Sequence, residues 1–217
     1  MNKIDETNGV GSKSQGTLIY LDGIGGVGKS TLAKAFSEKY SYKMYELPGK
    51  LFPEIEKYAN SLEIDKKAKF LANSLSRALT YPLIMKDILE GVNVIVDGSF
   101  LSPLVYQSII DDIDIKILFN IELDLLQPPL PTLFVLVKSK KITDGGENIL
   151  NKEAQEFQRV FNSAYDDLFS LLRSNKVIFY NNMISVDYDV NELYKVVVER
   201  SSNQVKGTSN IIQVVRD

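Results

Sequence analysis

One eight-residue segment near the N-terminus constrains this chain more than any other feature. Residues 23–30 are GIGGVGKS, which fits the pattern GxxxxGK[ST] at every fixed position. Glycines at these spacings let consecutive backbone amides curve around phosphate oxygens, and the helix that follows adds the positive end of its dipole. In this pattern Lys29 would reach the β- and γ-phosphates of a nucleotide, and the Ser30 hydroxyl would be a ligand of Mg²⁺.

The flanking sequence supplies the context that such a motif needs. Residues 17–21 form a short apolar run, and residues 30–40 place Leu32, Ala35 and Phe36 on one helical face. The order strand, loop, helix predicts a phosphate-binding loop that holds ATP. The predicted ATP-binding residues are Gly23, Ile24, Gly25, Gly26, Val27, Gly28, Lys29, Ser30 and Thr31.

Further apolar runs alternate with helical patterns along the rest of the chain. Residues 42–47, 92–96, 134–137 and 177–180 are predicted strands, and residues 66–89, 151–172 and 190–200 are predicted helices, with Pro82 expected to kink or divide the first of these. This alternation predicts an α/β fold, namely the three-layer P-loop NTPase fold with a parallel sheet of about five strands flanked by helices.

Composition and the polar ends of the chain indicate the partners, the location and the domain bounds that we expect. A net charge of −3 offers no basic surface for nucleic acid, and no stretch is long and apolar enough to span a membrane. We therefore expect a cytoplasmic protein whose partners are nucleotide substrates. Residues 1–16 are predicted to be a flexible leader, residues 17–200 a single kinase domain, and residues 201–217 a C-terminal tail of that domain.

The absence of cysteine and histidine decides which side chains can do chemistry. Without either residue, metal binding and proton transfer fall to carboxylates, lysines, hydroxyls and phosphate. The predicted strand 92–96 delivers Asp97 to its carboxyl end, where ligands bind in such sheets. Asp97 and Ser30 are the predicted Mg²⁺ residues, although a solvated Asp-Gly turn would also account for Asp97.

Four stretches resemble the thymidylate kinase family. Residues 21–31, LDGIGGVGKST, are similar to that family's FEGIDGSGKST, and residues 96–107, VDGSFLSPLVYQ, are similar to DRYxxSSxAYQ. Arg77 precedes Asp97 by twenty residues, the spacing of the family's acceptor-site arginine. Residues 130–132, LPT, resemble the LPxPDL segment that leads into a strand, and the helical pattern after Gly145-Gly146 resembles the one that follows the family's short lid.

The resemblance implies roles for several residues. Asp97 would lie near the metal and the transferred phosphoryl group, with Lys29, and Arg77 would bind the acceptor's phosphate or base. Tyr106 and Gln107 would line the sugar and base pocket. Lys138, Lys140 and Lys141 would neutralise charge on the transferred phosphate. Family members are usually dimers, so a homodimer is the corresponding expectation.

The departures from the family pattern all concern the acceptor. The arginine of the DR pair is Gly98 here, and the aspartate of the loop is Gly25. Asn73 replaces the aromatic residue that stacks on thymine, and Glu46 replaces an arginine expected near the end of the second strand. The donor side is intact while the acceptor side is altered.

These observations leave three functions open. The first is phosphoryl transfer from ATP to a nucleoside monophosphate, dTMP or a related one, with Glu46, Asn73, Arg77, Tyr106 and Gln107 at the acceptor. The second is a deoxynucleoside kinase in which Glu46 deprotonates a sugar hydroxyl, because a hydroxyl acceptor needs a base. The third is a regulatory protein that binds nucleotide without turnover. No NKxD-type segment is present, which argues against a GTPase.

Overall fold

A single parallel sheet organises the molecule. The computed structural model describes residues 14–49, 53–59, 65–138, 152–171, 177–181 and 186–204. Its five strands lie in the order β2-β3-β1-β4-β5, and every neighbouring pair is parallel. The strands are β1 (Leu18–Asp22), β2 (Lys43–Glu46), β3 (Val94–Asp97), β4 (Leu133–Lys138) and β5 (Val177–Asn181). The predicted parallel sheet of about five strands is confirmed.

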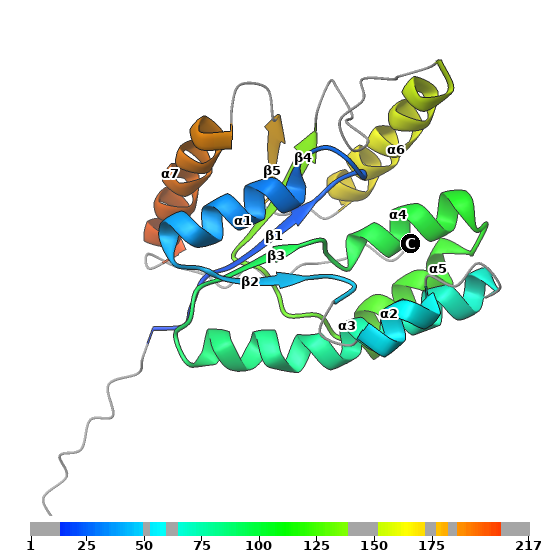
Figure 1. Ribbon diagram of the computed structural model, residues 1–217, viewed down its shortest axis with the longest axis horizontal. Helices are drawn as coiled ribbons and strands as arrows, with labels where there is room; N and C mark the ends of the chain where they lie inside the picture. Colours follow the sequence, from blue (N-terminus) through cyan, green and yellow to red (C-terminus); the bar gives the residue numbers. More distant parts are fainter. Residues whose placement is uncertain are drawn as a thin grey trace, which may run out of the picture.

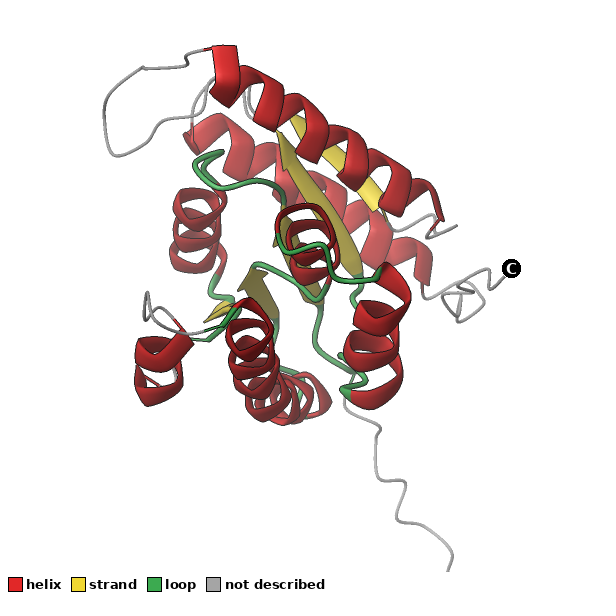
Figure 2. Cartoon of the chain, turned by 90° about the vertical axis from the view of Figure 1, so that its right-hand side faces the viewer, coloured by secondary structure: helices red, strands yellow, loops and turns green. Residues whose placement is uncertain are grey.

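Helices cover both faces of this sheet, which makes the fold three-layered. Figure 1 shows α1 and α7, which pack against each other, on one side of the strands and α3 on the other. Seen from the side in Figure 2, the strands lie enclosed among the helices. The helices are α1 (Lys29–Tyr40), α2 (Pro53–Ala59), α3 (Lys66–Leu89), α4 (Leu101–Ile110), α5 (Ile115–Phe119), the π-helix η1 (Asn120–Leu125), α6 (Lys152–Leu171) and α7 (Val186–Gln204).

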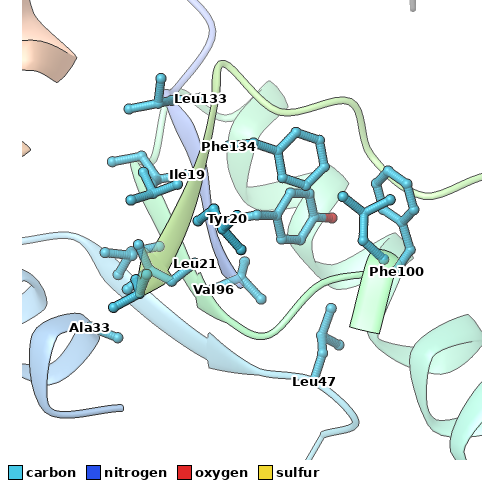
Figure 3. Packing of buried hydrophobic residues seen from close by; sticks show 14 of the residues in the cluster. Ile19, Tyr20, Leu21, Ala33, Leu47, Val96, Phe100, Leu133 and Phe134 are labelled. Carbon is cyan, nitrogen blue, oxygen red and sulfur yellow. The ribbon is translucent and has the colours of Figure 1, made fainter. Parts of the chain in front are cut away.

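The central strand β1 is buried along its whole length, as expected for a strand with neighbours on both edges and helices on both faces. Its side chains alternate between the two faces. Figure 3 shows Tyr20 beside Phe134 and Phe100, while Ile19 and Leu21 point the other way. The Tyr20 ring stacks on Phe134 with centroids 5.3 Å apart and meets Phe100 edge-on. The loop that follows β1 therefore begins at the end of a firmly packed strand.

The structure differs from the sequence-based expectations in a few elements. Helices α2, α4, α5 and η1 were not predicted. Helix α3 is not divided at Pro82: it continues to Leu89. Tyr81 and Ile84, on either side of the proline, are both buried, so packing outweighs the one hydrogen bond that proline cannot donate.

The predicted ends of the domain are described only in part. Gly16, placed in the predicted leader, donates its amide to the carbonyl of Ile88 at 2.8 Å, and α7 runs to Gln204, beyond the predicted boundary at residue 200. Residues 1–13, most of the tail and the lid segment with Lys140, Lys141 and Gly145-Gly146 lie outside the described residues. Among the described helices, none combines the length and apolar character needed to cross a membrane.

Candidate phosphate-binding and acceptor site

The phosphate-binding loop, residues 23–30, connects the buried strand β1 to α1 and takes a shape that only glycines adopt easily. Gly23, Gly26 and Gly28 have φ angles of 135°, 77° and 99°. A Cβ atom at Gly23 would lie 2.3 Å from the carbonyl oxygen of Val137, so β4 also excludes a side chain there. Gly28 caps α1 without a side-chain hydrogen bond, which leaves the first amides of the helix available to an anion.

Lys29 lies folded over this loop. Its Nζ donates to the carbonyl oxygens of Gly23 at 2.8 Å and Ile24 at 2.7 Å. Burial lowers the pKa of Lys29 from its ordinary value, while the nearby carboxylates of Asp22 and Asp97 oppose that change. The ammonium group is thus held at the loop, and the two carboxylates favour its charged form, which is the form that can neutralise bound phosphate.

The carboxyl ends of β2 and β3 bring Glu46 and Asp97 together, and Ser30, in the first turn of α1, meets Asp97 there. In the sheet register, Asp97 of β3 lies opposite both Leu21 of β1 and Glu46 of β2. Burial raises the pKa of Asp97, a hydrogen bond with the Ser30 side chain and the charge of Lys29 lower it, and Glu46 raises it further. The two predicted Mg²⁺ residues therefore lie in contact. No cluster of three or more carboxylates that could hold a metal occurs in the described part of the chain.

Asp22 is a site residue that the sequence analysis missed. It is the last residue of β1 and is fully buried. Its carboxylate accepts hydrogen bonds from four donors, the Gly23 amide at 2.7 Å, the Ser102 hydroxyl at 2.6 Å, the Tyr165 hydroxyl at 2.8 Å and the Ser99 hydroxyl. The signals in the sequence were an acidic residue that ends a buried strand directly before the loop glycines and its match to the glutamate of FEGIDGSGKST.

Tyr106 touches the phosphate-binding loop itself. Its hydroxyl accepts a hydrogen bond from the Gly25 amide at 2.9 Å, and its ring packs on Phe161 of α6 with centroids 4.7 Å apart. Burial raises the pKa of Tyr106, and the Gly25 amide lowers it. The neighbouring Gln107 has a buried Oε1 that no described donor reaches.

Arg77 is held in a buried ion pair. Only 2% of its side chain is exposed, and its guanidinium donates to both carboxylate oxygens of Glu122, from Nε at 2.9 Å and from Nη2 at 2.5 Å. Ser74 bonds to both partners. The charge of Arg77 is therefore compensated by Glu122, a residue that no sequence pattern singled out. Asn73, on the same helix, is half-buried.

Gly98 stands where the family pattern has arginine, and its surroundings explain the difference. Its φ angle is 91°, and a Cβ atom there would lie 2.4 Å from the carbonyl oxygen of Leu47. By contrast, a Cβ atom at Gly25 would meet no atom within 4 Å. The backbone thus excludes an arginine at position 98, whereas it leaves room for an aspartate at position 25.

Comparisons with known proteins agree with this geometry. A sequence model of the thymidylate kinase family matches residues 21–186. Thymidylate kinase from Candida albicans superposes with a TM-score of 0.68 at 21% identity, covering 93% of this chain and 99% of that one. Thymidylate kinase from Ehrlichia chaffeensis gives 0.63 at 20% identity, with 85% and 99% covered. No curated protein matches by sequence. Its family match, loop and sheet together place this chain in the thymidylate kinase family.

Proposed function

We propose that this protein transfers the terminal phosphoryl group of ATP to a nucleoside monophosphate, dTMP or a related deoxynucleotide. The observation that carries the proposal is the meeting of Lys29, Ser30 and Asp97 at the carboxyl edge of the sheet. Transfer between two phosphates depends mainly on positioning and charge neutralisation, which the loop amides and Lys29 can supply.

The residues at this edge also suit a magnesium ion bound together with ATP. A hydroxyl and a carboxylate, those of Ser30 and Asp97, are hard oxygen ligands of the kind Mg²⁺ takes alongside phosphate oxygens and water. A bound ion would supply positive charge next to the transferred phosphate.

A second candidate, phosphorylation of a nucleoside, is favoured by three specific observations. Glu122 compensates the charge of Arg77, and Gly98 cannot carry a phosphate-binding arginine. Glu46 lies opposite Asp97, close enough to raise its pKa. A carboxylate in that place could take the proton from a sugar hydroxyl, which an ionised phosphate acceptor does not need.

A coupled ADP-release assay across nucleosides and nucleoside monophosphates tests both candidates. Turnover with monophosphates supports the first, and turnover with nucleosides alone supports the second. ATP binding without turnover on any acceptor would instead indicate a regulatory protein that only binds nucleotide.

Glu46→Gln separates the two reactions further, with Glu38→Gln, on the exposed side of α1, as the matched control. For a monophosphate acceptor we expect a mild effect of Glu46→Gln. For a nucleoside acceptor kcat should fall by roughly 10² to 10⁴, as for a missing general base.

We also propose that two copies of the chain associate through α3. Four exposed leucines spaced by four residues form a row along that helix, namely Leu71, Leu75, Leu79 and Leu83. A row of this kind is apolar surface that a second copy would bury. Light scattering should show a dimer that Leu75→Glu with Leu79→Glu converts to monomer, while Leu89→Glu, exposed but outside the row, should not. A monomeric wild type would contradict the proposal.

A further inference from the structure

The buried carboxylate of Asp22 joins three segments that are far apart in the chain. The Gly23 amide belongs to the phosphate-binding loop, Ser99 and Ser102 lie at the start of α4, and Tyr165 lies on α6. Three of the four donors share Oδ1. A carboxylate that accepts so many hydrogen bonds in a buried place is held firmly, because moving it would leave several buried donors unpaired.

Helix α6 reaches the loop at a second point, one helical turn away. Phe161 precedes Tyr165 by four residues and so lies on the same face of the helix. Its ring packs against Tyr106, whose hydroxyl accepts the Gly25 amide. The face of α6 that carries Phe161 and Tyr165 is therefore linked to two amides of the loop, those of Gly23 and Gly25, each through one intermediate side chain.

The two backbone polar groups of Gly23 connect this network to the residue that would bind phosphate. Its amide is fixed by Asp22, and its carbonyl accepts the ammonium of Lys29 at 2.8 Å. The Tyr165 hydroxyl also lies 3.5 Å from that same carbonyl oxygen. Rotation of the Asp22 carboxylate would release the Gly23 amide, which lies one peptide before the carbonyl that accepts from Lys29.

We propose that Tyr165, acting through Asp22, is a positioning residue that holds the phosphate-binding loop in the shape that accepts ATP. The inference rests on the proposed ATP-binding role of the loop. Neither residue needs to touch the nucleotide, and Asp22 is turned to its four donors. The role assigned to α6 is to stiffen the loop through Asp22 and Tyr106.

Tyr165→Phe tests the proposal, since it removes one hydroxyl and keeps the buried ring. Tyr45→Phe is the matched control, because the Tyr45 hydroxyl donates to the carboxylate of Asp87 at 2.5 Å between β2 and α3. Both variants should lower Tm by a few degrees, since each loses a buried hydrogen bond to a carboxylate. Only Tyr165→Phe should weaken binding of a fluorescent ATP analogue, by about tenfold, and leave the acceptor KM unchanged.

Hydrogen exchange in the absence of nucleotide supplies a readout that does not depend on binding. The peptide that covers residues 22–29 should exchange several-fold faster in Tyr165→Phe and at the wild-type rate in Tyr45→Phe. If Tyr165→Phe fails to fold, Ser102→Ala removes another donor to Oδ1 and should give the same acceleration.

The outcomes separate this inference from the proposed function. A wild type that binds no nucleotide overturns the proposed function, while loop exchange still decides the role of Tyr165. A wild type that binds ATP, with Tyr165→Phe showing wild-type affinity and wild-type loop exchange, overturns the inference. A loss of Tm alone, equal to that of Tyr45→Phe, would mean that Tyr165 only stabilises the fold.

Discussion

Both carboxylate oxygens of Glu122 accept hydrogen bonds from the guanidinium of Arg77, at 2.9 Å and 2.5 Å, in a place where neither side chain is more than 2% exposed. Glu122 owes its position to a π-helical turn, η1, in which it is a buried residue. The arginine that the resemblance assigns to the acceptor is therefore also part of the internal packing.

Removing one partner of this ion pair should destabilise the protein far more than replacing both partners. We expect Glu122→Ala to lower the free energy of unfolding by about 3–5 kcal/mol, because Arg77 would remain as an unpaired buried charge. The double variant Arg77→Met with Glu122→Leu should cost much less, since apolar side chains of similar volume often replace buried pairs without loss. Urea denaturation of the three proteins measures the difference. Equal losses in the single and double variants would contradict it.

The same double variant tests whether Arg77 also binds the acceptor. If Arg77 binds the acceptor's phosphate or base, the acceptor KM should rise strongly in the double variant while the ATP KM stays within about twofold. Arg77→Ala alone cannot show this, because destabilisation and lost binding would be mixed.

Lys29→Ala should abolish phosphoryl transfer and weaken ATP binding. Losing one preorganised charge on the transferred phosphate costs on the order of 10²-fold or more in rate. Tm should change little, since the hydrogen bonds of Lys29 in the described structure go to carbonyls of its own loop and not to another element. Steady-state kinetics with Lys34→Ala, an exposed position on α1, provides the control. Retention of more than about a tenth of wild-type turnover would refute the assigned role.

Asp97→Asn should lower the rate far more than it lowers ATP affinity. The carboxylate lies beside Ser30 and Lys29 and would act on the metal-bound phosphate as charge develops. Comparing kcat with the dissociation constant of ATP checks this. Equal losses in both, or no loss, would place Asp97 outside the reaction.

The same substitution should reveal a stability that depends on pH. Burial raises the pKa of Asp97 above its ordinary value of 3.8, so the folded protein keeps this proton to higher pH than the unfolded chain does. Unfolding then releases a proton in the window above pH 4, and this group's contribution to the free energy of unfolding falls as the pH rises through it. Asp97→Asn should therefore gain stability relative to wild type between pH 4 and pH 7 in paired urea titrations. A difference that does not change with pH would contradict the prediction.

Placing the family's residues at positions 25 and 98 should affect stability very differently. Gly98→Arg forces a side chain into left-handed backbone and against the Leu47 carbonyl, and should cost about 2–5 kcal/mol of stability. Gly25→Asp has open space and should change stability by less than about 0.5 kcal/mol. Thermal unfolding of the two variants decides this, and a lower KM for a deoxynucleotide in Gly25→Asp would further support such an acceptor.

The sheet and the phosphate-binding loop could be predicted because both depend on short, local sequence patterns. Glycine spacing predicts the loop, and β-branched runs predict buried strands. The contacts of Asp22 escaped prediction because its partners Ser99 and Tyr165 lie 77 and 143 residues away. Glu122 escaped for the same reason, since it lies 45 residues from Arg77 in a π-helix that has no sequence signature.

The close approach of Leu47 and Gly98 limits how the acceptor site can be altered by substitution. The Leu47 amide donates to the Asp97 carbonyl, and the Leu47 carbonyl fills the space that a side chain at position 98 would occupy. An arginine at position 98 would therefore require the chain after β2 to move as well as a change of side chain. A new acceptor contact introduced by a single substitution has to come from other positions, and Gly25, with open space around it, is one of them.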